Sequence, residues 1–145
     1  MKAKTYSITR IINTNSDRVY KVISDFNNYD QWNSIIPSAK GELKEGVTLD
    51  LRMKSGNKTR PFKPKVISVT EGKSFTLSKV FISKGVGSLT HRFDFKSLSP
   101  NQTEFTQTWI GEGWLVKMMW PILAKGFSDF ETFNDDAVRY LEKTE

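Results

Sequence analysis

The chain has 145 residues, a length that suits one domain with a hydrophobic core of its own. Hydrophobic residues make up 37% of it and aromatic residues 12%, which excludes a disordered or fibrous protein. Cysteine is absent, which excludes disulfides, thiolate metal sites and cysteine nucleophiles, and the net charge is +6. We therefore expect a single domain over residues 1–145 in a reducing compartment.

The N-terminal residues lack the apolar core of a signal peptide. The longest uninterrupted apolar run, residues 118–124, is far shorter than the roughly 20 residues that cross a bilayer. We expect a cytoplasmic protein without a membrane span.

The first elements are a strand and a short helix. Alternation over residues 6–12 predicts an opening strand, which the polar residues 13–16 end. Asn15 or Ser16 can cap a following helix, in which apolar residues recur at helical spacing as far as Phe26. Residues 29–32 are expected to add one more helical turn or a structured loop.

Five turn signals divide the segment from residue 38 to residue 111 into six expected strands. These signals lie at residues 45–46, 55–57, 71–72, 83–85 and 99–101. Because no helical segment intervenes, neighbouring strands are expected to pair as antiparallel hairpins, with the first strand at the sheet edge.

The last third of the chain has a helical period. Apolar residues recur three or four positions apart between Met119 and Leu141, which predicts a long C-terminal helix. Pro121 has no amide hydrogen, so this helix either starts at Pro121 or is kinked there. We favour a kinked helix from about Trp114.

Strand alternation predicts which side chains face the helix. The inward set is Leu49, Leu51, Met53, Phe62, Pro64, Val66, Phe75, Leu77, Leu89, His91, Phe93, Phe95, Phe105, Gln107 and Trp109. Inward polar groups are few, namely His91, Gln107 and Asn134, with Arg10 if the first strand keeps strict alternation. A few polar groups in an apolar lining are typical of a ligand pocket, and a solid core with paired polar groups fits the same pattern.

Spaced residues along the whole chain carry a family resemblance. They are Asp25, Tyr29, Trp32, Asn33, Gly41, Gly46, Phe62, Pro64, Val66, Gly87, His91, Phe93, Phe105, Gln107, Gly111 and the segment from Phe130 to Asn134. In order and spacing the chain resembles the START-like or SRPBCC superfamily, particularly its polyketide cyclase/dehydrase and CoxG-like branch. One difference is Ser34, where this branch often has proline.

The resemblance implies an α+β helix-grip fold. Such a fold has a curved seven-stranded antiparallel sheet around a long C-terminal helix, with two short helices after the first strand. It also implies a cavity between sheet and helix for a hydrophobic or aromatic ligand, such as a lipid-, sterol- or polyketide-like molecule. A minority of the superfamily catalyses cyclisation or dehydration.

The leading hypothesis is a binding module for a hydrophobic small molecule. Its apolar wall is expected to comprise Met53, Phe62, Leu77, Phe93, Trp109, Leu123, Phe127 and Phe130. His91, Gln107 and Asn134 are expected to orient polar ligand atoms, and Trp32 and Asn33 to shape an entrance.

A second hypothesis is a cyclase or dehydratase in which His91 acts as acid or base. His91 is the only histidine, and its ordinary pKa near 6.5 suits proton transfer. Asp94, Glu104 and Glu112 take outward parity, so no inward acid accompanies His91. One histidine without inward acids does not predict a metal site, and no glycine pattern predicts a nucleotide site, so no cofactor is expected.

A third hypothesis is an interaction module. Six basic residues occur without an intervening acid, namely Arg52, Lys54, Lys58, Arg60, Lys63 and Lys65. We expect them to form one outward cationic face that contacts an anionic membrane or an acidic protein, together with residues 114–123. The alternative is an exposed face that discourages edge aggregation. Nucleic acid is not expected, because the outward side of this hairpin lacks interleaved aromatic residues for base stacking.

Overall fold

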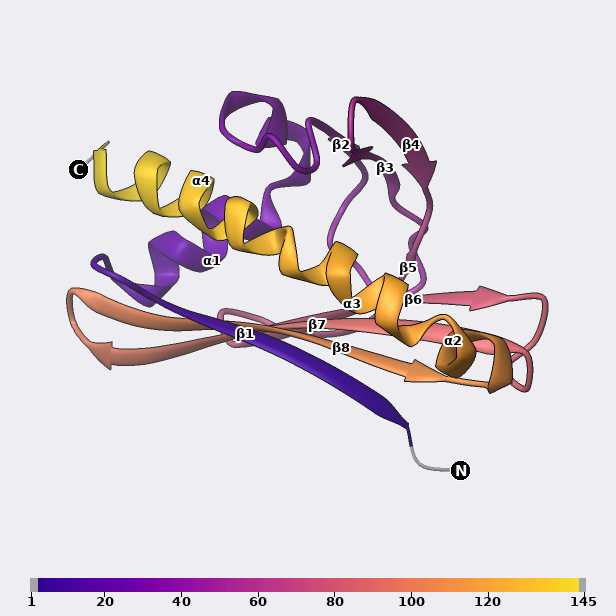
Figure 1. Cartoon of the computed structure of the whole chain (residues 1–145). Coiled ribbons are helices and arrows are strands. Elements are labelled where there is room, and N and C mark those ends of the chain that lie inside the picture. The colour runs from indigo at the N-terminus through magenta and orange to yellow at the C-terminus, as the bar shows by residue number, and fades with distance from the viewer. Residues whose placement is uncertain (1–2, 144–145) are drawn as a thin grey trace.

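Two antiparallel sheets account for the strands of the computed structural model, which describes residues 3–143. The larger sheet has the order β1-β8-β7-β6-β5 and the smaller one the order β2-β3-β4 (Figure 1). The larger sheet contains β1 (Lys4–Ile12), β5 (Lys65–Thr70), β6 (Ser74–Phe81), β7 (Gly87–Ser99) and β8 (Gln102–Glu112). The smaller one contains β2 (Ser38–Lys40), β3 (Asp50–Ser55) and β4 (Lys58–Phe62). The expected single seven-stranded sheet is therefore wrong in strand number and continuity.

The division between the sheets falls at Pro64. The sequence predicted one strand between the turn at residues 55–57 and the turn at residues 71–72. The structure has two strands there, because β4 pairs with β3 and β5 pairs with β6. Proline cannot donate a backbone hydrogen bond, which favours a break in the ladder at this point. The carbonyl of Pro64 still accepts from the Leu49 amide at 2.8 Å, and the Val66 amide donates to Val47 at 2.9 Å. These bonds tie the smaller sheet to β5.

The short helices are placed differently from the expectation. One α-helix, α1 (Ser16–Ser24), and one 3-10 helix, η1 (Phe26–Gln31), follow β1. The Asn15 side chain caps α1 by accepting from the Arg18 amide at 2.9 Å. Two further short helices, α2 (Trp114–Met118) and α3 (Trp120–Ser128), precede the final helix α4 (Phe130–Lys143).

The expected kinked helix is thus three consecutive helices. The first break is at Met119, and Pro121 lies in the first turn of α3, where its missing amide hydrogen costs no helical bond. The second break is at Asp129, between α3 and α4. The three helices run in series across one face of the larger sheet, and α1 lies on the same face (Figure 1). None of the helices within residues 3–143 has the length and apolar character to span a membrane.

The core lies between α4 and the larger sheet. The inward parity expected for β8 is confirmed, because Phe105, Gln107 and Trp109 are buried. From α4, Phe133 is fully buried and stacks on Phe105 with ring centroids 6.4 Å apart. These aromatic side chains fill the space between α4 and the larger sheet.

Two glycines let α2 and α3 lie close to the strand ends. A Cβ atom at Gly111 would come within 2.4 Å of the Trp120 ring and 2.7 Å of Val116. Gly113, where the chain leaves β8, has a φ of 90°, which side-chain-bearing residues rarely adopt. Glycine at these positions therefore sets the height of α2 and α3 above the sheet.

Candidate functional site

A cavity of about 400 Å³ lies between the β-structure and the C-terminal helices. Its wall comes from η1, the following loop, both sheets, α3 and α4. Ile122, Lys54 and Arg60 line it and are exposed, so the cavity reaches the surface beside them.

Nine of the expected site residues line this cavity. They are Met53, Phe62, Leu77, His91, Phe93, Trp109, Leu123, Phe127 and Phe130. The sequence interpretation missed Phe26 and Tyr29 on η1 and the pair Ile35 and Ile36, which also line it. An apolar pair directly before Pro37 was the available signal. The Tyr29 hydroxyl donates to the Ile23 carbonyl at 2.5 Å, so this tyrosine contributes a largely apolar surface.

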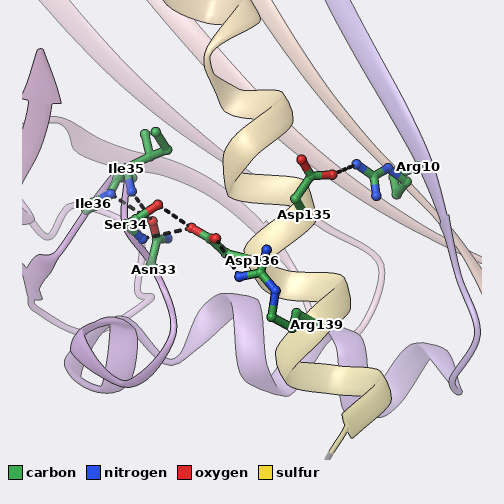
Figure 2. Close-up of polar contacts among 8 residues, drawn as sticks. All are labelled: Arg10, Asn33, Ser34, Ile35, Ile36, Asp135, Asp136 and Arg139. Atoms are coloured by element: carbon green, nitrogen blue, oxygen red, sulfur yellow. Dashed lines mark hydrogen bonds and ion pairs between the residues drawn. The ribbon is translucent and has the colours of Figure 1, made fainter. Parts of the chain in front are cut away.

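Trp32 and Asn33 do not line the cavity, contrary to the expectation that they shape its entrance. Trp32 packs in the aromatic cluster, with ring centroids 5.0 Å from Tyr29 and 5.3 Å from Phe133. The Asn33 side chain is buried and accepts from the amides of Ile35 at 3.0 Å and Ile36 at 2.7 Å (Figure 2). Asn33 therefore positions two residues of the cavity wall.

Asp136 on α4 holds the same loop from the other side. Its carboxylate accepts from the Ser34 amide at 2.9 Å and from the Ser34 hydroxyl at 2.6 Å (Figure 2). Arg139 donates to it at 3.3 Å. The adjacent Asp135 points to the opposite side of the helix and pairs with Arg10 of β1 (Figure 2). Arg10 therefore keeps inward parity and reaches α4 without entering the cavity.

Gln107 and Asn134 lie behind the cavity wall, although the sequence placed them in the pocket. Both are fully buried. The Gln107 side chain accepts from His91 Nε2 at 2.8 Å and donates to Asn134 Oδ1 at 2.9 Å. Asn134 in turn donates to Glu131 Oε1 at 3.2 Å. A chain of hydrogen bonds thus runs from the cavity, through the core, to the exposed side of α4.

His91 is the polar group at the cavity end of this chain. Its ring stacks between Phe93 and Trp109, with centroids 4.1 and 4.3 Å away. Burial lowers the pKa of His91 to about 3, because desolvation of the imidazolium outweighs the hydrogen bond to Gln107. The side chain is therefore neutral at physiological pH.

The expected single cationic face is wrong. The register of the β3–β4 hairpin places Arg60 opposite Met53, whereas Arg52 lies opposite Pro61. Arg60 therefore shares the inward face with Met53 and Phe62, while Arg52 points outward. Lys58 lies two residues before Arg60 on its face, and Lys65 belongs to β5 of the other sheet. The basic residues are exposed but divided between faces.

Part of the positive charge nevertheless lies at the cavity. Lys54, Arg60 and Lys79 line the cavity together with a single acid, Asp129. The lining is thus cationic where it meets the surface and apolar further in. Such an arrangement suits an apolar molecule with a negatively charged or strongly polar end.

Solved structures confirm the START-like fold. A START superfamily protein from Mycobacterium smegmatis is 16% identical, with a TM-score of 0.75 over 97% of this chain and 99% of the other. The Zhui aromatase/cyclase from Streptomyces sp. R1128 is 10% identical, with a TM-score of 0.77 over 97% and 94% of the two chains. A norcoclaurine synthase mutant from Thalictrum flavum is 13% identical, with a TM-score of 0.75 over 97% and 95%.

The sequence itself matches a family model. No curated protein sequence matches the chain. Residues 4–142 match the model described as polyketide cyclase / dehydrase and lipid transport. The chain therefore belongs to the polyketide cyclase/dehydrase and lipid transport family, and its fold is START-like.

Proposed function

We propose that this protein binds a hydrophobic or aromatic small molecule in the cavity between the larger sheet and the C-terminal helices. The observation that carries this proposal is the cavity of about 400 Å³, a volume in the range of small-molecule sites. Cores normally close-pack, so an unfilled space of this size costs stability, and a bound guest that fills it offsets that cost. Aromatic rings such as Phe93, Trp109 and Phe127 supply flat surfaces for an apolar ligand body.

Known ligands of similar folds support an aromatic guest. A norcoclaurine synthase structure from Thalictrum flavum, 13% identical with a TM-score of 0.73, is a complex with dopamine and hydroxybenzaldehyde. The present cavity offers the same class of guest a lining of stacked rings and one imidazole.

Binding fits the geometry better than acid–base catalysis by His91. A side chain with a pKa of about 3 is neutral at pH 7 and is a weak base. Its Nε2 hydrogen is committed to Gln107, so it has no free proton to donate to a substrate. The hypothesis of a cyclase driven by His91 therefore has little chemical support.

A substitution on α3 that partly fills the cavity tests the proposed binding. Leu123→Trp adds an indole to the wall, and we expect it to weaken binding of the fluorescent naphthalene dye 1-anilinonaphthalene-8-sulfonate at least tenfold. Leu98→Trp is the matched control, because Leu98 is 43% exposed on β7 and does not line the cavity. Equal dye affinity in both variants would contradict the proposal. Native mass spectrometry of protein from its source then identifies the natural ligand class.

A second candidate function is docking on an anionic membrane surface. Trp114, Met118 and Ile122 on α2 and α3 are 54%, 67% and 72% exposed. Lys117 and Lys125 lie on the same two helices, which suits negatively charged headgroups. Ile122 also lines the cavity, so a ligand could pass between cavity and membrane at this point.

Vesicle sedimentation tests this second candidate. We expect binding to vesicles containing phosphatidylglycerol, weakened by salt and lost in Ile122→Ser. Ile67→Ser is the control, because Ile67 is also exposed, at 47%, but lies on β5. Binding that is equal for the two variants would exclude α3 as the contact.

A further inference from the structure

The chain of hydrogen bonds behind His91 has a fixed direction. Glu131 ends it, and an ionised carboxylate accepts hydrogen bonds but donates none. Asn134 must therefore direct its NH2 group to Glu131 and its oxygen to Gln107. Gln107 must then direct its NH2 group to Asn134, which leaves its oxygen facing His91. Every amide in the chain is oriented by the acid at its end.

This direction sets the tautomer of His91. Because Gln107 presents an oxygen, the hydrogen of the neutral imidazole must be on Nε2. The other nitrogen, Nδ1, then carries a lone pair and has no hydrogen-bond partner within residues 3–143. Phe93 and Trp109 cover the two ring faces, and the Phe130 ring packs nearly perpendicular to the imidazole with centroids 5.4 Å apart. His91 lines the cavity, so the part of the ring edge that Phe130 and Gln107 leave uncovered meets it.

We infer that His91 Nδ1 is a hydrogen-bond acceptor that selects ligands with a hydroxyl or N–H group. This inference rests on the proposed function and names the ligand class, an apolar or aromatic molecule with a buried donor such as a phenol. A ligand with only an ether or carbonyl oxygen at that point would place one lone pair against another. Glu131, Asn134 and Gln107 are positioning residues, because they act through His91 and do not line the cavity.

The tautomer can be observed directly, because His91 is the only histidine in the chain. We expect nitrogen NMR of protein labelled with 15N-histidine, without a histidine tag, to show a protonated Nε2 and an unprotonated Nδ1 at pH 7. A protonated Nδ1 would overturn the inference.

Glu131→Gln tests the origin of the direction. A glutamine at this position can donate as well as accept, so the direction of the hydrogen bonds from residue 131 to His91 can reverse. We therefore expect a second tautomer of His91, protonated on Nδ1, to appear. Glu142→Gln is the control. It removes the same charge from α4, and Glu142 takes no part in the hydrogen bonds that link Glu131 to His91. A single unchanged tautomer in Glu131→Gln would contradict the positioning role.

A matched pair of ligands tests the selection. We expect 2-naphthol to bind more tightly than 2-methoxynaphthalene, and His91→Phe to reduce this preference by about 3- to 10-fold. Addition of 2-naphthol should also shift the Nδ1 resonance. If both compounds bind equally and the resonance does not move, the donor selection is wrong while the proposed function stands. If neither compound binds, the proposed function fails and the inference with it.

Discussion

His91 makes the folded state sensitive to acid through the cost of burying its cation. Its pKa is about 3 in the folded protein, below the value near 6.5 expected for an unfolded chain. Between these two values the unfolded chain binds a proton that the folded chain does not, so stability falls as pH falls below 6.5.

The pH dependence gives the first prediction. From pH 7 to pH 5, we expect the wild-type protein to lose about 2 kcal/mol more unfolding free energy than His91→Phe. Urea unfolding at both pH values measures this difference. Parallel pH profiles for the two proteins would show that His91 is not buried as the neutral form.

Asp136 and Asp135 are neighbours in sequence with different environments. The Asp136 side chain is 7% exposed and holds Ser34, whereas that of Asp135 is 52% exposed in its ion pair with Arg10. We expect Asp136→Ala to cost about 2–3 kcal/mol of unfolding free energy, because two donors of Ser34 lose their acceptor.

Asp135→Ala serves as the control, with an expected cost within about 1 kcal/mol. Chemical denaturation measures both. Equal losses would mean that the loop from Asn33 to Ile36 is held by other contacts.

At the scale of elements, the position of α2 and α3 depends on Gly111. A methyl group there would overlap Trp120, so Gly111→Ala is expected to cost about 1–3 kcal/mol and to displace the helices. Gly126→Ala is the matched control on α3, because the added methyl meets nothing within 4 Å apart from the adjacent residues and the backbone of its own helix. This change is expected to be neutral or to stabilise by up to about 1 kcal/mol, since alanine favours helix.

Thermal unfolding separates the two glycine variants. We also expect Gly111→Ala to lower dye affinity, because Ile122 and Leu123 on α3 form part of the cavity wall. Unchanged stability in Gly111→Ala would show that α2 adapts at no cost.

Local sequence patterns predicted some features of the strands and helices and missed others. The turns and the strand parity could be predicted, since alternation in β7 and β8 depends only on neighbouring residues. The break at Pro64 was missed, because it depends on β4 and β5 choosing partners in different sheets. The break at Asp129 was also missed, because the helical period of apolar residues continues across it and Gly126 lies within α3 rather than at its end.

At the scale of the whole molecule, cavity and stability are linked. A ligand that binds only the folded state adds about 1.4 kcal/mol of unfolding free energy for each tenfold excess over its Kd. We expect 2-naphthol to raise the melting temperature with this dependence in the wild type, and much less in Leu123→Trp. A shift of the same size in both would place the binding site outside the cavity.

The sequence by itself determined the α+β class, the turn positions, the inward faces of β7 and β8 and the helical period of the C-terminal third. These properties follow from residues close in the chain, because side-chain period and turn chemistry are local. Tertiary structure alone decided the division into two sheets, the volume of the cavity and the buried hydrogen bonds that link Glu131 to His91. Each of these depends on strand register or on side-chain volumes meeting across the fold, which no local pattern specifies.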